Sequence, residues 1–269
     1  MFDSHIHTIH SHDSEQTLVE LCEEAIEKGV KGITVTDHVM TRDFDKLNTL
    51  PRFQTLFPDV EATRALYGDR VKLLCGVEIS EMLDDMEKYD LIVSLGDYDV
   101  ILGSVHYVGT DMMPYAKIDF GTRSQQELTD YLNQYFTDVT QMLEHADFDV
   151  LCHLTCPLRY MIGRYKCKVG WREFEPQILS ILKKVIERNI SLEINTAGYT
   201  DETGYHSLPD KDILQIYYEL GGRMLTLGSD SHRNRAVARN FEAVKETLRT
   251  IGFEYYCYYE KRKPVQVPL

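Results

Sequence analysis

Short apolar runs alternate with amphipathic stretches along almost the whole chain. The apolar runs predict seven strands, which we place at 1–6, 32–36, 72–77, 99–105, 149–153, 191–195 and 223–228. The amphipathic stretches predict helices, among them 17–28, 124–145, 173–188, 210–220 and 234–250. Strands that alternate with helices pair in parallel through crossover connections. The pattern therefore predicts an α/β fold built on a parallel sheet.

The predicted units follow one another without a Pro-, Gly- or Ser-rich linker over the 269 residues. Seven strand–helix units in an unbroken series favour one closed barrel over two smaller domains. We therefore expect a single domain over 1–269, a distorted (β/α)7 barrel that resembles a TIM barrel. Its last segment, 255–269, is expected to be a tail made of a final strand and a loose end.

Composition and charge exclude several classes of protein. No apolar run is long enough to span a membrane, and the opening residues MFDSHIHT do not resemble a secretion signal. The six cysteines form no CxxC pair, which favours reduced, structural thiols and a cytoplasmic location. A net charge of -14 argues against a general nucleic-acid partner, because nucleic acid needs a basic face.

Residues that commonly bind metals stand at the carboxyl end of one predicted strand after another. In parallel barrels these strand ends share one rim, where the loops build the active site. The residues concerned are His5, His7, Asp37, His38, Glu78, His106, His153, Asp230 and His232.

Two of these groups have a spacing that suits a shared ion. His5 and His7 are two positions apart on a strand, so both side chains point the same way, and Asp230 and His232 repeat this spacing. Imidazole mixed with carboxylate favours Zn, Fe or Mn over Mg or Ca. One ion cannot bind this many ligands. We therefore expect two to three divalent ions, with adjacent ions sharing a carboxylate and a hydroxide.

Each position also has a simpler interpretation when it is taken alone. His106 or His153 could be a hydrogen-bonded core histidine, and Asp37 with His38 could cap a helix. Caps and core residues do not explain His, Asp or Glu at so many strand ends together. The combined pattern therefore favours a metal centre.

The segments DSHIHTIHSHDS, TVTDHV, GVEI, GSVH, CHL and GSDSH occur in this order between residues 1 and 245. Together they resemble the motifs of the PHP (polymerase and histidinol phosphatase) family, and LEINTAG resembles its histidinol-phosphate phosphatase type. The resemblance implies a distorted barrel of seven β/α units with a trinuclear metal cluster at the carboxyl rim. It also implies a hydrolase of histidine biosynthesis, a phosphoric monoester hydrolase that converts L-histidinol phosphate to L-histidinol and phosphate.

The resemblance also assigns ligands to each ion. The first ion takes His5, His7, Asp230 and a bridging Glu78, and the second takes Glu78, His106 and His153. The third takes His12, His38 and His232, although the position assigned to His12 is often Asp in this family. The remaining histidines, His10, His145 and His206, are interpreted as surface residues or as neighbours of ligands.

The expected chemistry is attack on a phosphate monoester by a hydroxide held between two ions. Glu78 would bridge the ions, Asp230 and His232 would relay a proton to the leaving alcohol, and Asp37 would orient a ligand. Ser104 and Ser229 lack the G-x-S-x-G elbow of a nucleophile, so we interpret them as packing or hydrogen-bonding groups, Ser104 on the substrate side.

The loop 155–172 carries several cations and no acid in an acidic chain. It could be an ordinary solvated surface, or it could hold the phosphate through Arg159, with Arg164 in reserve and Tyr160 stacking on a flat ring. Asn195, at the end of a predicted strand, could bind a polar substrate tail.

Other functions remain open on the sequence alone. These are a PHP-type nuclease or nucleotide phosphatase, another small phosphate monoesterase, an amide-hydrolysing barrel, and a barrel that keeps metals without catalysis. The acidic charge disfavours polynucleotides, and no Lys ends a predicted strand as a carbamylated metal ligand would. The expected partner is a small phosphate monoester, with no membrane and with an oligomeric state that the sequence does not give.

Overall fold

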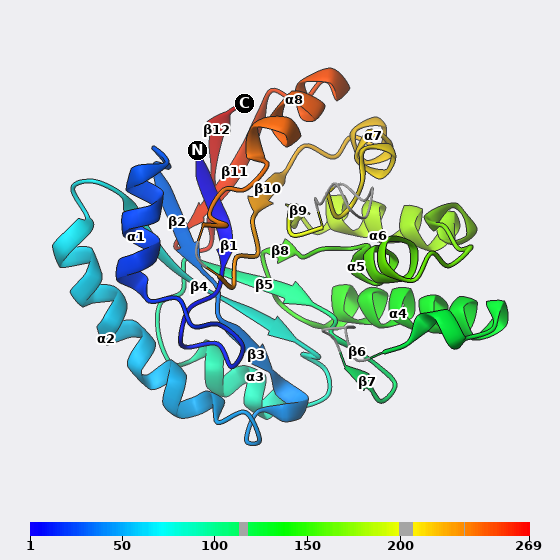
Figure 1. Ribbon diagram of the computed structural model, residues 1–269, viewed down its shortest axis with the longest axis horizontal. Coiled ribbons are helices and arrows are strands. Elements are labelled where there is room, and N and C mark those ends of the chain that lie inside the picture. Colours follow the sequence, from blue (N-terminus) through cyan, green and yellow to red (C-terminus); the bar gives the residue numbers. More distant parts are fainter. Residues whose placement is uncertain (113–117, 199–206, 234) are drawn as a thin grey trace.

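A computed structural model describes residues 1–112, 118–198, 207–233 and 235–269, and it contains all seven predicted strands (Figure 1). They lie side by side in parallel, in the order β1, β2, β4, β5, β8, β9 and β10. Their bounds are Phe2–Ile6, Gly32–Val35, Lys72–Ser80, Val100–Ser104, Val150–Leu151, Ser191–Asn195 and Leu225–Gly228. The predicted α/β fold with a parallel sheet is confirmed.

The first and last of these strands meet at their carboxyl ends. Ile6 and Ser231 form a parallel bridge, the amide of His7 donates to the carbonyl of Ser231, and the amide of Asp230 donates to the carbonyl of His5. The strands therefore come round into a barrel-like ring that is bonded at this edge. These backbone bonds hold the predicted metal ligands of β1 against those that follow β10.

At the amino ends of β1 and β10, the last segment of the chain enters the sheet. Strand β11 (Tyr255–Glu260) pairs with β10, and β12 (Lys263–Pro268) pairs antiparallel with β11 over six residue pairs. The ring of Tyr258 stacks on Phe2 of β1, with centroids 3.9 Å apart. The prediction of a loose end after one strand was wrong, because 263–268 form an ordered edge strand.

All five predicted helices are present. They are α1 (Leu18–Glu27), α4 (Gln125–His145), α6 (Glu175–Glu187), α7 (Lys211–Glu219) and α8 (Phe241–Ile251). Capping boxes at Thr17 and Ser124 fix the first turns of α1 and α4, since each hydroxyl accepts from the amide three residues on. Helix α8 begins later than predicted, after Asn240 in a left-handed conformation.

The structure contains further elements that the pattern did not predict. They are α2 (Thr49–Tyr67), α3 (Met86–Val93), the short α5 (Cys156–Leu158) and the short strands β3 (His38–Met40), β6 (Tyr107–Val108) and β7 (Asp111–Met112). Strand β3 pairs with β4 and places His38 opposite Glu78. This small extension of the sheet brings two predicted ligands together.

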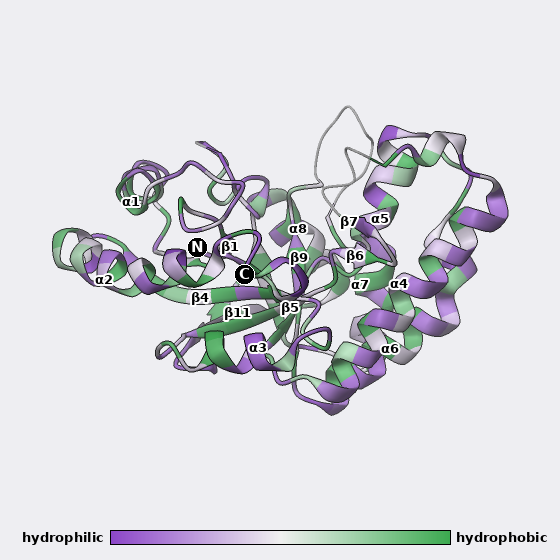
Figure 2. Cartoon of the chain, turned by 90° about the horizontal axis from the view of Figure 1, so that it is seen from below, coloured by the Kyte–Doolittle hydropathy of each residue, from purple (hydrophilic) through white to green (hydrophobic). Residues whose placement is uncertain are grey.

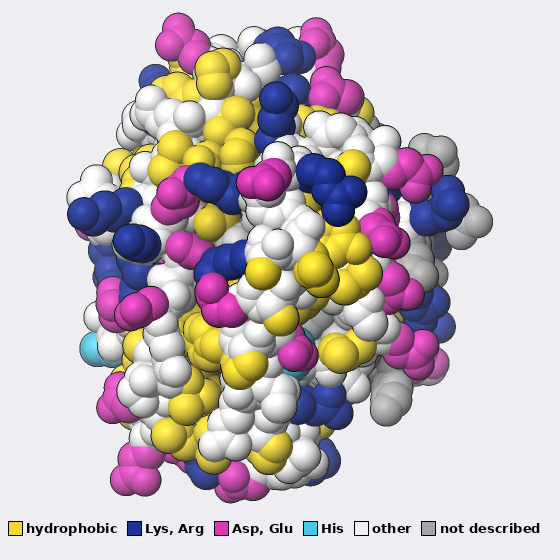
Figure 3. Space-filling model, turned by 90° about the vertical axis from the view of Figure 1, so that its left-hand side faces the viewer, with side chains coloured by type: hydrophobic (Ala, Val, Ile, Leu, Met, Phe, Trp, Pro, Cys, Tyr) yellow, Lys and Arg dark blue, Asp and Glu magenta, His cyan; other side chains and the backbone are white. Residues whose placement is uncertain are grey.

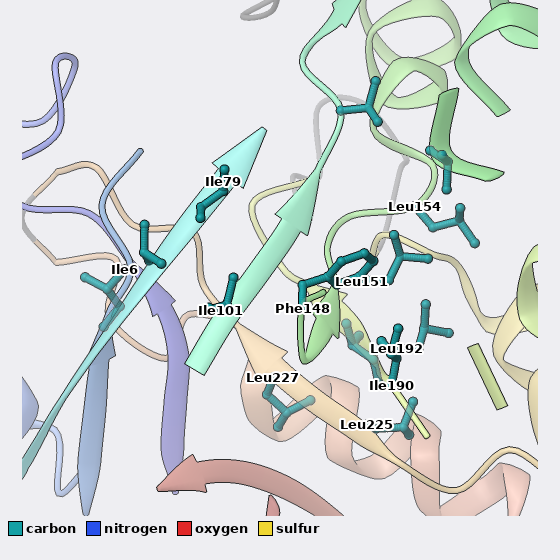
Figure 4. Close-up of a cluster of buried hydrophobic side chains, with 14 of the residues drawn as sticks. Ile6, Ile79, Ile101, Phe148, Leu151, Leu154, Ile190, Leu192, Leu225 and Leu227 are labelled. Atoms are coloured by element: carbon teal, nitrogen blue, oxygen red, sulfur yellow. The ribbon is translucent and has the colours of Figure 1, made fainter. Parts of the chain in front are cut away.

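The strands of the sheet consist largely of hydrophobic residues, whereas the helices around them mix hydrophobic and hydrophilic ones (Figure 2). Apolar side chains of both lie in one buried cluster. Ile79, Ile101, Leu151 and Leu192 come from four successive strands and lie in one buried cluster with Phe148 (Figure 4). Strands buried on both faces read as continuous apolar runs, which is why the sequence located them well. The same core fixes the strand ends from which the polar side chains project.

On the face that carries α1 and α2, basic and acidic side chains are interspersed and no basic band is visible (Figure 3). Within the described residues, none of the helices combines the length and apolar character that a bilayer crossing requires.

Candidate metal centre

The carboxyl ends of the strands hold a cluster of imidazoles and carboxylates. His5 is in β1 and His7 follows it, Glu78 lies near the end of β4, and Asp230 and His232 follow β10. His106 and His153 each stand two residues after the end of a strand. Of the nine predicted ligands, eight converge here and are buried or partly buried: His5, His7, His38, Glu78, His106, His153, Asp230 and His232.

Glu78 is the centre of this cluster, and its side chain is almost fully buried. Its Oε2 lies 2.7 Å from His38 Nδ1, 3.3 Å from His5 Nε2 and 3.5 Å from His7 Nε2. Its Oε1 lies 3.0 Å from His153 Nε2 and 3.3 Å from His106 Nε2. Each carboxylate oxygen thus faces a different group of imidazoles, which is the arrangement that a bridging ligand requires.

Asp230 supplies a second carboxylate on the β10 side. Its Oδ1 lies 3.2 Å from His7 Nε2 and 3.4 Å from His232 Nδ1, and its Oδ2 accepts a hydrogen bond of 3.1 Å from Asn195 Nδ2. The other Asn195 contacts are also internal, because its Oδ1 accepts from the Ala197 amide and Nδ2 approaches Glu193. Asn195 therefore holds Asp230 in place, and its predicted contact with substrate stays a prediction.

Asp13 supplies a third carboxylate that the sequence reading missed. Its Oδ2 lies 3.5 Å from His232 Nε2 and 3.7 Å from His38 Nε2. The predicted ligand next to it, His12, approaches Asp13 at 3.9 Å and lines the same cavity. The carboxylate of Asp13 thus lies within 3.7 Å of a nitrogen of both rings. The ring centroid of His12 lies 5.6 Å from that of His38, and the ligand role of His12 stays a prediction.

Electrostatics keep all three carboxylates ionised. Burial alone would raise the pKa of Glu78, but the charges of His38, His106 and His5 hold it well below its usual range. Burial likewise opposes the charge of Asp230 and Asp13. His5 and His7 nevertheless hold the pKa of Asp230 well below its usual value, and His38 and His232 lower that of Asp13. The cluster therefore presents fixed negative charge to whatever cation occupies it.

The pKa values of His7 and His232 are shifted in opposite directions. Burial lowers the pKa of His7 well below its usual value, and the neighbouring His38 and His232 lower it further. Burial also opposes charge on His232, but the hydrogen bond to Asp13 and the charge of Asp230 raise its pKa to about 9. Without a metal ion, protons are thus shared unequally among rings that lie in contact.

Hydrogen bonds outside the cluster determine which ring nitrogen faces inward. Ser11 Oγ donates to Asp37 Oδ1 at 2.7 Å and lies 3.1 Å from His7 Nδ1, from which it can accept. The backbone carbonyl of Asp230 lies 3.0 Å from His232 Nδ1. With a ring proton on Nδ1, His7 and His232 would each present the lone pair of Nε2 to a bound metal ion. Asp37 thus supports His7 through Ser11, which is consistent with its predicted orienting role.

The inward-facing atoms fit divalent metal ions. His5 Nε2 and His7 Nε2 lie 3.0 Å apart, and His38 Nε2 and His232 Nε2 lie 3.2 Å apart. Three sets of candidate ligand atoms lie within 4.8 Å of one another at this rim: His5, His7 and Asp230; His38, Glu78 and His106; and His7, His38 and His232. Nitrogen and carboxylate donors in these sets match the preferences of Zn, Fe and Mn.

Two of the candidate ligands have a backbone conformation that is unusual for their residue type. His153 has a φ of 25° and Asp230 a φ of 52°, both in the left-handed region that favours glycine. Backbone of this kind concentrates at functional sites, where surrounding contacts hold it. Both turns direct a side chain from a strand end back towards the rim.

A cavity opens on the cluster. It is lined by His12, Asp13, His38, Met40, His106, His153, Cys156, Arg159, Tyr160, Asp230 and His232. Arg159 and Tyr160 begin a π-helical turn, Arg159–Arg164, and the Arg159 guanidinium lies over the Tyr160 ring. The structure thus brings Arg159 and Tyr160 to the site, as the sequence suggested.

The other predicted substrate contacts lie elsewhere. Arg164 is exposed and lies over Tyr165. The Ser104 hydroxyl is buried and is not among the cavity-lining groups of the described residues. Of the remaining histidines, His10 contacts Asp59 and the carbonyl of Arg52, His145 is at the end of α4, and His206 lies outside the described residues.

Glu193 is a second residue that the sequence reading missed. It is buried in β9, and its Oε1 lies 2.5 Å from His5 Nδ1. The sequence could have indicated this position. Glu193 and Asn195 alternate with apolar residues in the run SLEIN, so their side chains face the same side of the strand.

This ring of parallel strands with clustered histidines and carboxylates at its carboxyl rim defines the class to which the protein belongs. The PHP domain matches residues 3–197, so the chain belongs to the PHP domain family. The family assignment made from the sequence is confirmed.

Particular relatives are similar over most of this chain. The probable histidinol-phosphatase of Clostridium acetobutylicum is 30% identical over 249 residues, which cover 90% of each chain. The histidinol-phosphatase of Lactococcus lactis is 27% identical, over 93% of this chain and 91% of its own.

A solved structure has the same fold. It is the histidinol phosphate phosphatase of Lactococcus lactis in complex with zinc, L-histidinol and phosphate, which aligns with a TM-score of 0.78 and 23% identity over 98% of each chain. The similarity covers nearly the whole of both chains, so the overall fold is common to both.

Proposed function

We propose that this protein is a metal-dependent histidinol-phosphatase, which hydrolyses L-histidinol phosphate to L-histidinol and phosphate. One observation carries the proposal: a buried carboxylate, Glu78, lies within 3.5 Å of five imidazoles at the rim of a PHP barrel. The substrate is inferred from relatives named histidinol-phosphatase, which match about nine-tenths of the chain.

The residues of the cluster can be divided among three metal ions. We take these ions to be zinc, the metal in the Lactococcus lactis structure. We assign His5, His7, Glu78 and Asp230 to the first, and Glu78, His106 and His153 to the second. His38 and His232 would hold the third, with Asp13 as a further candidate ligand beside His12, because its carboxylate lies within 3.7 Å of a nitrogen of both rings. Bound ions would lower the pKa of water and neutralise the phosphate oxygens.

The residues around the ions hold the substrate. Arg159 presents a planar fork that can bind two phosphate oxygens, and its cavity position beside Asp230 and His232 suits that role. Tyr160 offers a ring face near the same place. The proton that the leaving alcohol needs is assigned to the Asp230–His232 pair, whose Oδ1 and Nδ1 atoms lie 3.4 Å apart.

The six cysteines are free thiols. This supports the cytoplasmic location expected from the sequence, since free thiols are usual in reducing compartments.

The test is phosphate release by the zinc-reconstituted protein from a panel of small phosphate monoesters. We expect L-histidinol phosphate to have the highest kcat/KM and chelation to abolish turnover until zinc is added back. Preference for a nucleotide or another monoester would contradict histidinol phosphate as the substrate and would favour a nucleotide phosphatase or another small phosphate monoesterase. Metal-loaded protein without activity on any monoester would contradict a phosphatase function.

A further inference from the structure

Glu193 lies outside the proposed ligand set, yet it contacts several members of it. The structure assigns to Glu193 the role of a positioning residue, which fixes the tautomer of His5 and holds His153 and Asp230 at the metal centre. This inference rests on the metal site of the proposed function, although not on its substrate.

The contact with His5 determines which nitrogen of that ring can bind a metal. Glu193 Oε1 lies 2.5 Å from His5 Nδ1, and a carboxylate can only accept a hydrogen bond. The ring proton is therefore on Nδ1. His5 Nε2 then keeps its lone pair and faces His7 Nε2 at 3.0 Å and Glu78 Oε2 at 3.3 Å.

The second oxygen reaches two other strands. The backbone amide of His153 donates to Glu193 Oε2 at 2.8 Å, which helps to hold the left-handed turn of that ligand. Asn195 Nδ2 approaches the same oxygen at 3.3 Å and donates to Asp230 Oδ2 at 3.1 Å. One buried carboxylate thus connects ligands that come from β1, β8 and β10.

The backbone leaves space for this carboxylate. Gly228, the last residue of β10, stands where an added Cβ would lie 2.2 Å from Glu193 Oε1 and 2.6 Å from the Cβ of His5. A side chain at this position would push Glu193 away from His5. Glycine here therefore permits the contact.

An alternative is that Glu193 is itself a ligand, since His5, Cys152 and Glu193 offer atoms within 4.8 Å of one another. The distance of 2.5 Å between His5 Nδ1 and Glu193 Oε1 is that of a short hydrogen bond and is too small for an ion between them. Burial also raises the pKa of the Cys152 thiol well above its usual value, which disfavours the thiolate that a metal needs.

The decisive variant is Glu193→Gln, which keeps size and shape. Oε2 is approached by two N–H donors, so the carbonyl oxygen of Gln must stay there and its NH2 group must face His5 Nδ1. His5 would then accept at Nδ1 and carry its proton on Nε2, which removes the lone pair for the metal. We expect zinc affinity to fall by about ten- to a hundredfold, the usual effect of losing such a partner.

Two measurements test this without substrate: zinc affinity by competition with a chelator, and the ¹⁵N NMR signals of His5 in the zinc-loaded protein. The inference predicts that His5 of the zinc-loaded wild type carries its proton on Nδ1, and that this Nδ1–H signal is lost in Glu193→Gln, whose His5 carries its proton on Nε2. Asp99→Asn is the matched control, because Asp99 is a buried carboxylate that accepts from the amides of Cys75 and Lys261 away from the metal centre. It should keep wild-type zinc affinity.

Gly228→Ala gives an independent test if Glu193→Gln does not fold, and it should weaken zinc binding although no ligand is removed. Unchanged affinity and tautomer in Glu193→Gln, or an equal loss of affinity in Asp99→Asn, would overturn the inference. Loss of zinc in Cys152→Ser would also overturn it, in favour of a cysteine site. Zinc binding without hydrolysis of histidinol phosphate would contradict the proposed substrate and leave this inference intact.

Discussion

Glu78 is the buried carboxylate at the centre of the site, and its charge must be compensated by its neighbours. A buried carboxylate costs several kcal/mol of desolvation unless positive charge compensates it. Its pKa is lowered, not raised, because His38, His106 and His5 surround it. The surroundings of Glu78 are therefore those of a group that holds cations.

We predict that Glu78→Gln loses metal and reduces turnover of histidinol phosphate by several orders of magnitude. The amide removes the negative charge shared by two ions and places N–H donors against imidazole nitrogens. Elemental analysis and phosphate release measure the two effects. Full metal content with near-normal turnover would contradict a bridging role, and Asp99→Asn controls for the loss of a buried carboxylate.

Arg159→Lys should keep the charge at the cavity but lose the planar fork. We expect kcat/KM to fall about ten- to a hundredfold, which corresponds to about 1.5–3 kcal/mol, with no change in metal content. Arg172→Lys is a matched control, since Arg172 pairs with Asp212 and lies over Trp171. Equal kinetics for wild type, Arg159→Lys and Arg159→Ala would remove Arg159 from the site.

The residues of the site could be predicted where they lie on strands. Alternation fixes the direction of a strand side chain, so His5 and His7 were predictable as an inward-facing pair. No such rule applies in the loop after β1, which contains His12 and Asp13. There the path of the loop in the folded chain determines how close each side chain comes to His38. The role of Glu193 could not be predicted, because its partner His5 is 188 positions away and only the folded sheet brings the two strands together.

Among the elements, the strands were more predictable than the helices. Each buried strand is a compact apolar run, but α2 contains Pro51 and Pro58 and follows Asn48 in a left-handed conformation. Those residues usually mark turns, so its helical pattern was concealed. The segment KPVQVP was expected to be part of a loose end, yet it forms an edge strand, which tolerates its prolines.

The pairing of β11 and β12 has a measurable consequence. We predict that Tyr258→Ala lowers the free energy of unfolding by about 2–4 kcal/mol, since it removes a buried ring and its stacking on Phe2. The melting temperature should fall by about 5–10 °C. Gln266→Ala, an exposed position on β12 opposite Cys257, should change it little. Equal melting temperatures for all three proteins would mean that the hairpin does not stabilise the sheet.

At the scale of the molecule, the proposed metal ions join the beginning of the chain to its end. His5 and His7 come from the first strand and Asp230 and His232 follow the last strand of the ring, so ions bound to both hold the ring closed. Ligands that bind only the folded state stabilise it as their concentration exceeds the dissociation constant. We therefore expect chelation to lower the melting temperature, and an unchanged value after confirmed metal loss would contradict the coupling.

This stabilisation should depend on pH. The pKa of His232 is about 9 in the metal-free fold against 6.5 for an ordinary His, so its protonation stabilises that fold below pH 6.5 and the contribution is lost as the pH rises through 9. Metal binding at the same ring needs the neutral form and improves over this range. The difference in melting temperature between zinc-loaded and chelated protein should thus increase from pH 6.5 to 9. A constant or decreasing difference would argue against His232 as a ligand.

The central claim is that one rim of the barrel holds a multinuclear metal centre, and the number of ions per chain tests it most directly. The measurement is elemental analysis of protein that has been stripped, reconstituted with zinc and freed of unbound metal. The account predicts two to three zinc ions per wild-type chain. A wild-type chain that retains one ion or none would contradict it.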